Sequence, residues 1–218
     1  MYGFTDKAFG LLTKLTANNK REWFKAHKDE FDQSLLDPFA VVLEAISRNL
    51  ESSGIELRGG KETMFRMHRD VRFSKDKSPY KTSVSGILTR RGDKRESAGF
   101  VYLHLDTDGG FAAAGRYNLT PKALGPIRDR IIEDADRFAE ILGDLNGSGR
   151  DLDRSMSLSS MPRGYAAYGE HQFADELKLK SMMVRSALSK SAWKTGDVVE
   201  AVSTLALDTR DFIDFVSV

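Results

Sequence analysis

The 218-residue chain contains no cysteine. This absence excludes disulfide bonds, thiolate nucleophiles and cysteine-ligated zinc or iron–sulfur centres. The sequence also lacks any apolar run near the roughly 20 residues that a transmembrane helix needs. Its first residues, MYGFTDKAF, have no apolar stretch typical of a signal peptide. We therefore expect a soluble, cytoplasmic protein that has no contact with a membrane.

Net charge is small, because 33 Lys and Arg oppose 32 Asp and Glu to give +1. The distribution is uneven, however. The segment from Met64 to Arg95 holds ten basic and three acidic residues, a local charge of +7, so the rest of the chain sums to −6. Such polarisation is typical of a site for an anionic partner. The hydrophobic content of 40% is enough to form an ordinary core.

Apolar residues at intervals of three and four predict helices in both the first and the last part of the chain. Trp23 belongs to the second of these stripes, and its position on the apolar face predicts a core side chain. Start signals are Thr5 as an N-cap and two Pro residues in first helical turns. The predicted helices follow Thr5, cover Lys20–Phe31, run from Asp37-Pro38 to near Gly54 and from Thr120-Pro121 to about Leu142, and include Val198–Leu207 and Thr209–Val216.

The centre of the chain changes to the period of two that is typical of strands. Asp106-Thr107-Asp108-Gly109-Gly110 is a hairpin turn signal between two of them. Helices followed by consecutive strands and then helices predict an α+β fold, in which an antiparallel sheet from the central third packs against N-terminal, central and C-terminal helices. We expect one domain over residues 1–218. The predicted strands are Thr63–Phe73, which alternates imperfectly, Val84–Thr89, Gly99–Asp106, Phe111–Tyr117 and Ser181–Leu188.

Two apparent motifs fail on inspection. A phosphate-binding loop needs Gly-Lys-Ser/Thr, but Gly60-Lys61 is followed by Glu62. The Asp106–Phe111 stretch has glycine and phenylalanine where a calcium loop needs an oxygen ligand and a glycine. We therefore predict neither site.

The basic segment Met64–Arg95 contains most of the candidate functional residues. In an extended conformation Arg66, His68, Asp70 and Arg72 share one face, where Asp70 can bond to the arginines. The alternate residues, from Phe65 to Phe73, are mostly apolar and are expected to face the core.

The loop that follows is Ser74–Lys81, which Pro79 stiffens. Basic and hydroxyl donors of fixed geometry suit a phosphate or carboxylate. We therefore expect an anionic small molecule to bind a site built from Arg69, Arg72, Lys77, Tyr80 and Lys81, with Arg116 and Lys180 as further members.

Alternatives remain open. The segment also fits a non-catalytic module that binds nucleic acid or an acidic protein, or a solvated face of surface ion pairs. Enzymatic activity, the reaction, the cofactor and the oligomeric state are not determined by these residues. His68-x-Asp70 and His104-x-Asp106 could meet at a metal if their strands were neighbours, but hydrogen-bonded structural histidines are commoner, and we predict no metal site.

Several blocks of the sequence are characteristic: Arg69–Lys81, Asn18–Phe24, Gly99–Leu103 with Gly115, Pro121 and Ile127-Arg128, and Pro162–Tyr165 with His171 and Leu177–Lys180. These blocks resemble one family, known as domain of unknown function 2461. The central block is the most specific, and the resemblance extends over nearly the whole chain. It implies a single α+β domain and assigns no activity. Where the family often has a glycine run and a His-Pro pair, this chain has Ala112-Ala113-Ala114-Gly115 and His171-Gln172.

Overall fold

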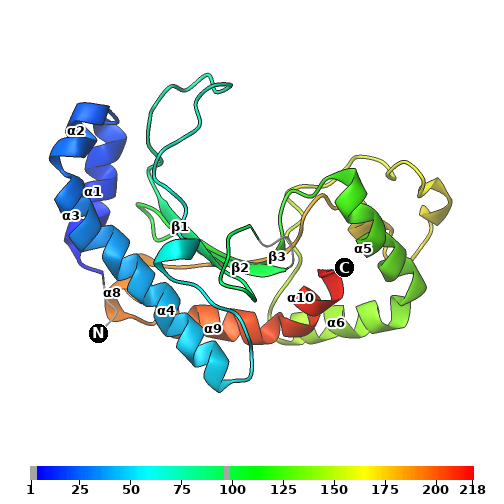
Figure 1. Ribbon diagram of the computed structural model, residues 1–218. Helices are drawn as coiled ribbons and strands as arrows, with labels where there is room; N and C mark the ends of the chain where they lie inside the picture. Colours follow the sequence, from blue (N-terminus) through cyan, green and yellow to red (C-terminus); the bar gives the residue numbers. More distant parts are fainter. Residues whose placement is uncertain (1–3, 96–98) are drawn as a thin grey trace.

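A four-stranded antiparallel sheet lies at the centre of the computed structural model, which describes residues 4–95 and 99–218 (Figure 1). The strands follow one another across the sheet in chain order. About half of the chain, 49%, is helical, and helices pack around the sheet. The predicted α+β class is therefore confirmed. The strands are β1 (Val84–Leu88), β2 (Phe100–Leu105), β3 (Phe111–Arg116) and β4 (Met182–Ala187).

The two faces of β2 differ in burial, as its alternating sequence predicts. Val101, Leu103 and Leu105 are buried, whereas Tyr102 and His104 are only half-buried. Successive side chains of a strand point to opposite faces of the sheet, so these two sets lie on opposite sides. The tight turn into β3 is also as predicted and depends on two glycines with φ values of +116° and +101°.

Helices cover the face on which Leu103 lies. Helix α4 packs so close to β1 that a Cβ on Gly86 would lie 2.7 Å from Leu43 and 3.3 Å from Phe39. Gly86 pairs with Leu103, so α4 lies on that side, and α9 and α10 extend the cover to β3 (Figure 1). The helices of the N-terminal part and of this layer are α1 (Asp6–Ala17), α2 (Arg21–Ala26), α3 (Lys28–Phe31), the π-helical turn η1 (Asp32–Leu36), α4 (Asp37–Ser52), α9 (Val198–Asp208) and α10 (Arg210–Val216).

The single helix predicted after Thr120 is two helices, α5 (Pro121–Glu133) and α6 (Ala135–Gly147). The backbone leaves the helical region at Asp134, with φ −122° and ψ 49°. Acidic residues at this point are unfavourable at the end of one helix dipole and favourable at the start of the next. The break directs Phe138 of α6 onto Phe215. Two further short helices are α7 (Ala174–Leu177) and α8 (Lys190–Thr195).

The core contains a different tryptophan from the one that the sequence indicated. Trp193 of α8 is fully buried and packs against Phe39 and Phe4, with ring centroids 5.8 and 5.2 Å apart. Trp23 is only partly buried at the edge of the core, where it stacks on His27. The prediction that Trp23 is a core residue was therefore wrong, because a short helix at the surface exposes part of its apolar face.

The segment predicted as a first strand is the largest difference from the sequence analysis. Thr63–Phe73 forms only isolated bridges, Met64 with Gly86 and His68 with Tyr80. Residues 65–82, here called the arm, project from the edge of the sheet at β1 (Figure 1). Phe73 was expected to face the core and is instead 95% exposed.

Side chains of the arm explain this outcome. Asp70 accepts a hydrogen bond from the backbone N–H of Arg72, and Asp76 accepts one from that of Ser78. Such local bonds offer the backbone an alternative to a sheet ladder, and Pro79 has no N–H for one. The arm therefore folds on itself.

No helix in the described part of the chain is long and apolar enough to cross a membrane.

Candidate functional site

Asn19, which lies between α1 and α2 and 61 residues before Tyr80, anchors the arm to the N-terminal helices. The Asn19 carboxamide accepts from the backbone N–H of Tyr80 at 3.0 Å and donates to its carbonyl at 2.9 Å. The Tyr80 ring is buried and stacks on Phe24, with centroids 4.0 Å apart, and lies near His68. The base of the arm is thus fixed at the residue that precedes Lys81.

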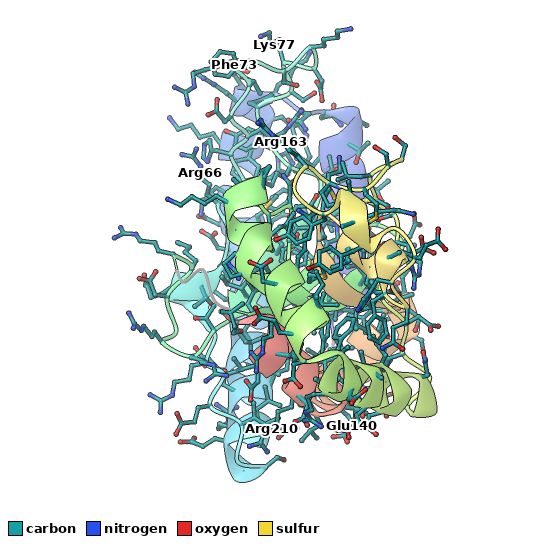
Figure 2. The ribbon with its side chains drawn as sticks, turned by 90° about the vertical axis from the view of Figure 1, so that its right-hand side faces the viewer. Arg66, Phe73, Lys77, Glu140, Arg163 and Arg210 are labelled. Atoms are coloured by element: carbon teal, nitrogen blue, oxygen red, sulfur yellow. The ribbon has the colours of Figure 1, made fainter. Side chains whose placement is uncertain are left out.

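Three of the predicted ligand-binding cations hold the arm together. Arg69 pairs with Asp76 and donates to the Ser78 carbonyl at 3.1 Å. Arg72 forms two-point hydrogen bonds with Asp70, at 2.7 and 3.0 Å, and Lys77 donates to the Val71 carbonyl at 3.0 Å. Figure 2 shows Phe73 and Lys77 at the outer end of the arm.

Hydrogen bonds within the arm lower the pKa values of its two carboxylates. The pKa of Asp76 is lowered to about 2, chiefly by hydrogen bonds from Ser78 and then by Arg69. The pKa of Asp70 is lowered by hydrogen bonds from the side chain and the backbone of Arg72. Both acids therefore stay charged at neutral pH and partly neutralise the arm.

Arg116 and Lys180 lie away from the arm. Arg116 is buried and donates to the carbonyls of Val216 and Val218, at 3.1 and 3.0 Å. Lys180 lies just before β4, which is the edge strand farthest from β1 and the arm. The structure therefore does not bring the seven predicted ligand-binding residues together.

The face of the sheet opposite α4 carries a row of aromatic rings. On this face Tyr102 and His104 follow each other along β2, and Phe111 of β3 lies opposite His104 in the register. The His104 and Phe111 rings stack with centroids 4.8 Å apart, and Tyr102 lies 5.7 Å from Phe111. Phe65, expected in the core, instead joins the row at 6.2 Å from Tyr102. We call this surface the aromatic face.

Two cations stand over the aromatic face. The ammonium of Lys81 lies 5.5 Å from the centre of the Phe65 ring, and the guanidinium of Arg185 on β4 lies 3.8 Å from that of Phe111. Among the described residues neither Lys81 nor Arg185 forms an ion pair, and the same holds for nearby Arg66. Burial, and then the charge of Arg66, lower the pKa of Lys81.

His104 lies at the centre of this arrangement. Burial is the main cause that lowers the pKa of His104; Arg185 and Lys81 lower it further, against the opposing effect of Asp106. The imidazole is therefore neutral at pH 7, and its Nδ1 forms a hydrogen bond with the Tyr102 hydroxyl at 3.1 Å. Nε2 lies 3.5 Å from the Asp106 carboxylate. Burial raises the pKa of Tyr102, which keeps the phenol protonated.

The two His-x-Asp pairs lie in different surroundings, His68 beside Tyr80 and His104 beside Phe111. In residues 4–95 and 99–218 no three His, Asp or Glu side chains gather in a way that would hold a metal ion.

Sequence reasoning found Lys81 and missed its partners on the aromatic face. Alternation along β2 did place Tyr102 and His104 on one side of the strand. A single cation within the apolar strand sequence Met182-Met-Val-Arg185 was an available signal that was not used. Nothing local, however, indicates that Arg185 and Lys81 lie near the same histidine, because their proximity depends on the order of all four strands.

Comparison with known proteins extends the resemblance seen in the sequence. No curated protein and no solved structure matches the chain significantly. One family model, described as "Conserved hypothetical protein (DUF2461)", matches residues 7–215, which is nearly the whole chain. The chain therefore belongs to the DUF2461 family of conserved hypothetical proteins.

Proposed function

We propose that the aromatic face binds an anionic small molecule through a phosphate or carboxylate group held between Lys81 and Arg185. The observation that carries this proposal is the position of the two cations, which act on the same neutral histidine and form no ion pair among the described residues. Each cation lacks an ion-pair partner among the described residues, so a bound anion would interact favourably with both.

Arg185 and Lys81 are held in position for anion binding in different ways. Arg185 is fixed by stacking on Phe111, which leaves the donor edge of its planar guanidinium able to bind two oxygens at once. Lys81 is held by the clamped residue Tyr80 before it, and partial burial strengthens any charge–charge interaction it makes. Hydrogen bonds to charged groups contribute about 1.5–3 kcal/mol each.

Calorimetric titration with pyrophosphate tests the proposal. Lys81→Met and Arg185→Met each remove a charge but keep apolar bulk, and we expect each to weaken binding by about tenfold or more. The matched controls are Lys14→Met and Arg48→Met, which remove charges from exposed positions on α1 and α4. The proposal is contradicted if the parent does not bind pyrophosphate. It is also contradicted if all four variants bind pyrophosphate as tightly as the parent does.

The outer end of the arm favours a second candidate function, the binding of nucleic acid by a non-catalytic module. Phe73 is 95% exposed, and the Arg72 guanidinium lies 5.8 Å from the centre of its ring. Exposed rings beside cations are the usual means of binding single strands without a sequence preference. In this case Phe73→Ser should weaken binding of a thymidine oligonucleotide, and Lys77→Met should reduce its salt dependence by about one ion. An oligonucleotide that binds both variants like the parent excludes this candidate.

A further inference from the structure

We infer that the ligand of the aromatic face is a nucleotide, with its phosphate between Lys81 and Arg185 and its base in a hollow beside Phe111. This inference rests on the proposed anion site and adds the chemical class of the molecule. It is carried by a second feature, the surface on the far side of Arg185.

A shallow hollow of about 480 Å³ adjoins the anion site at β4. Its lining includes Phe111, Leu152, Asp153, Arg185 and Ala187. This volume lies within the range of small-molecule sites and is sufficient for one base and part of a sugar. Arg185 lines the hollow and also acts on His104, so one guanidinium borders both the hollow and the proposed anion site.

The hollow contains a flat surface suited to an aromatic ring. The Arg185 guanidinium carbon lies 3.8 Å from the centre of the Phe111 ring. Arg185 is exposed, so the side of the guanidinium that faces away from Phe111 is open to solvent. A guanidinium plane can stack on a base while its edge donates to a phosphate. Ala187 lies opposite Phe111 in the register, and its small side chain leaves room above the sheet.

Charge sets the orientation of the nucleotide. Beyond Arg185, the charged residues that line the hollow are Asp151, Asp153 and Arg154, and Arg154 already forms an ion pair with Glu176. Hydrogen bonding from Ser155 lowers the pKa of Asp153, which is therefore ionised at neutral pH. A carboxylate accepts hydrogen bonds from the N–H groups of a base and repels a phosphate. The phosphate therefore lies toward Lys81 and the base toward Asp153.

Titration of the parent with AMP, GMP, CMP, UMP and ribose 5-phosphate measures the contribution of the base. Stacking of one base corresponds to a gain of about tenfold or more in affinity. We expect at least one nucleotide to bind tighter than ribose 5-phosphate by this factor. Equal binding of all five compounds overturns the inference and leaves the proposed anion site standing, whereas failure of all five, together with pyrophosphate, overturns the proposed function itself.

Ala187→Leu locates the base, because the larger side chain occupies part of the hollow and removes neither cation. We expect this variant to bind pyrophosphate like the parent and to lose the advantage of the nucleotide over ribose 5-phosphate. The retained pyrophosphate binding also shows that the variant is folded. Ala201→Leu, the same change at an exposed position of α9, is the control and should keep the advantage. An advantage that Ala187→Leu retains in full shows that the base does not lie in the hollow.

Discussion

Asn19→Ala removes the clamp that holds the base of the arm. The side chain of Asn19 makes two hydrogen bonds to the backbone of Tyr80, at 2.9 and 3.0 Å, and both groups are partly buried. A typical protein hydrogen bond contributes about 0.5–1.5 kcal/mol net, so the pair contributes about 1–3 kcal/mol. We expect Asn19→Ala to lower the free energy of unfolding by this amount.

Asn18→Ala is the matched control, since it removes the same side chain from the adjacent position. Asn18 donates one hydrogen bond, at 3.0 Å, to the exposed carbonyl of Lys14. Urea denaturation should show a loss below about 1 kcal/mol for this control. Hydrogen exchange gives a second, local measurement, because the Tyr80 amide donates to Asn19 and should lose protection only in Asn19→Ala.

Two results would refute this reasoning. One is an equal loss of stability in Asn18→Ala and Asn19→Ala. The other is unchanged protection of the Tyr80 amide in Asn19→Ala. Either result would mean that stacking of the Tyr80 ring on Phe24 alone holds the base of the arm.

Three further predictions follow from burial and backbone geometry. Trp193→Ala should cost about 3–5 kcal/mol in thermal or urea unfolding and Trp23→Ala clearly less, since only Trp193 is fully buried; equal losses would contradict this difference. The pKa of His104 is lowered in the folded state, so the parent should lose stability as pH falls below the ordinary pKa of 6.5, and His104→Leu should lose less between pH 7.5 and 5.5; identical slopes would exclude His104 as a cause. Gly115→Ala should cost at least about 1–3 kcal/mol, since φ is +125° and the new Cβ would lie 2.1 Å from the Met182 carbonyl oxygen; an unchanged melting temperature would show that the backbone adapts.

The elements predicted correctly are those that neighbouring residues determine. The β2–β3 hairpin follows from strict alternation and an Asp-Gly turn, and α4 follows from a proline start and a regular apolar stripe. Local signals therefore sufficed for the sheet and its main covering helix.

Local side-chain hydrogen bonds explain one difference, and long-range contacts explain the other. Residues 63–73 alternate well enough to suggest a strand, but their side chains bond within the arm instead of joining the ladder. The candidate site was only partly predictable because it depends on long-range contacts. Lys81 and Arg185 are brought toward His104 by the pairing of four strands, which no local pattern records.

A crystal structure of the protein with tungstate, an anomalously scattering analogue of phosphate, tests the proposed anion site most directly. We expect a tungsten peak over His104, with oxygens at about 2.7–3.2 Å from the ammonium of Lys81 and the guanidinium of Arg185. Tungstate bound only at the outer end of the arm, beside Arg72 and Lys77, or absent from the aromatic face, would contradict the proposal.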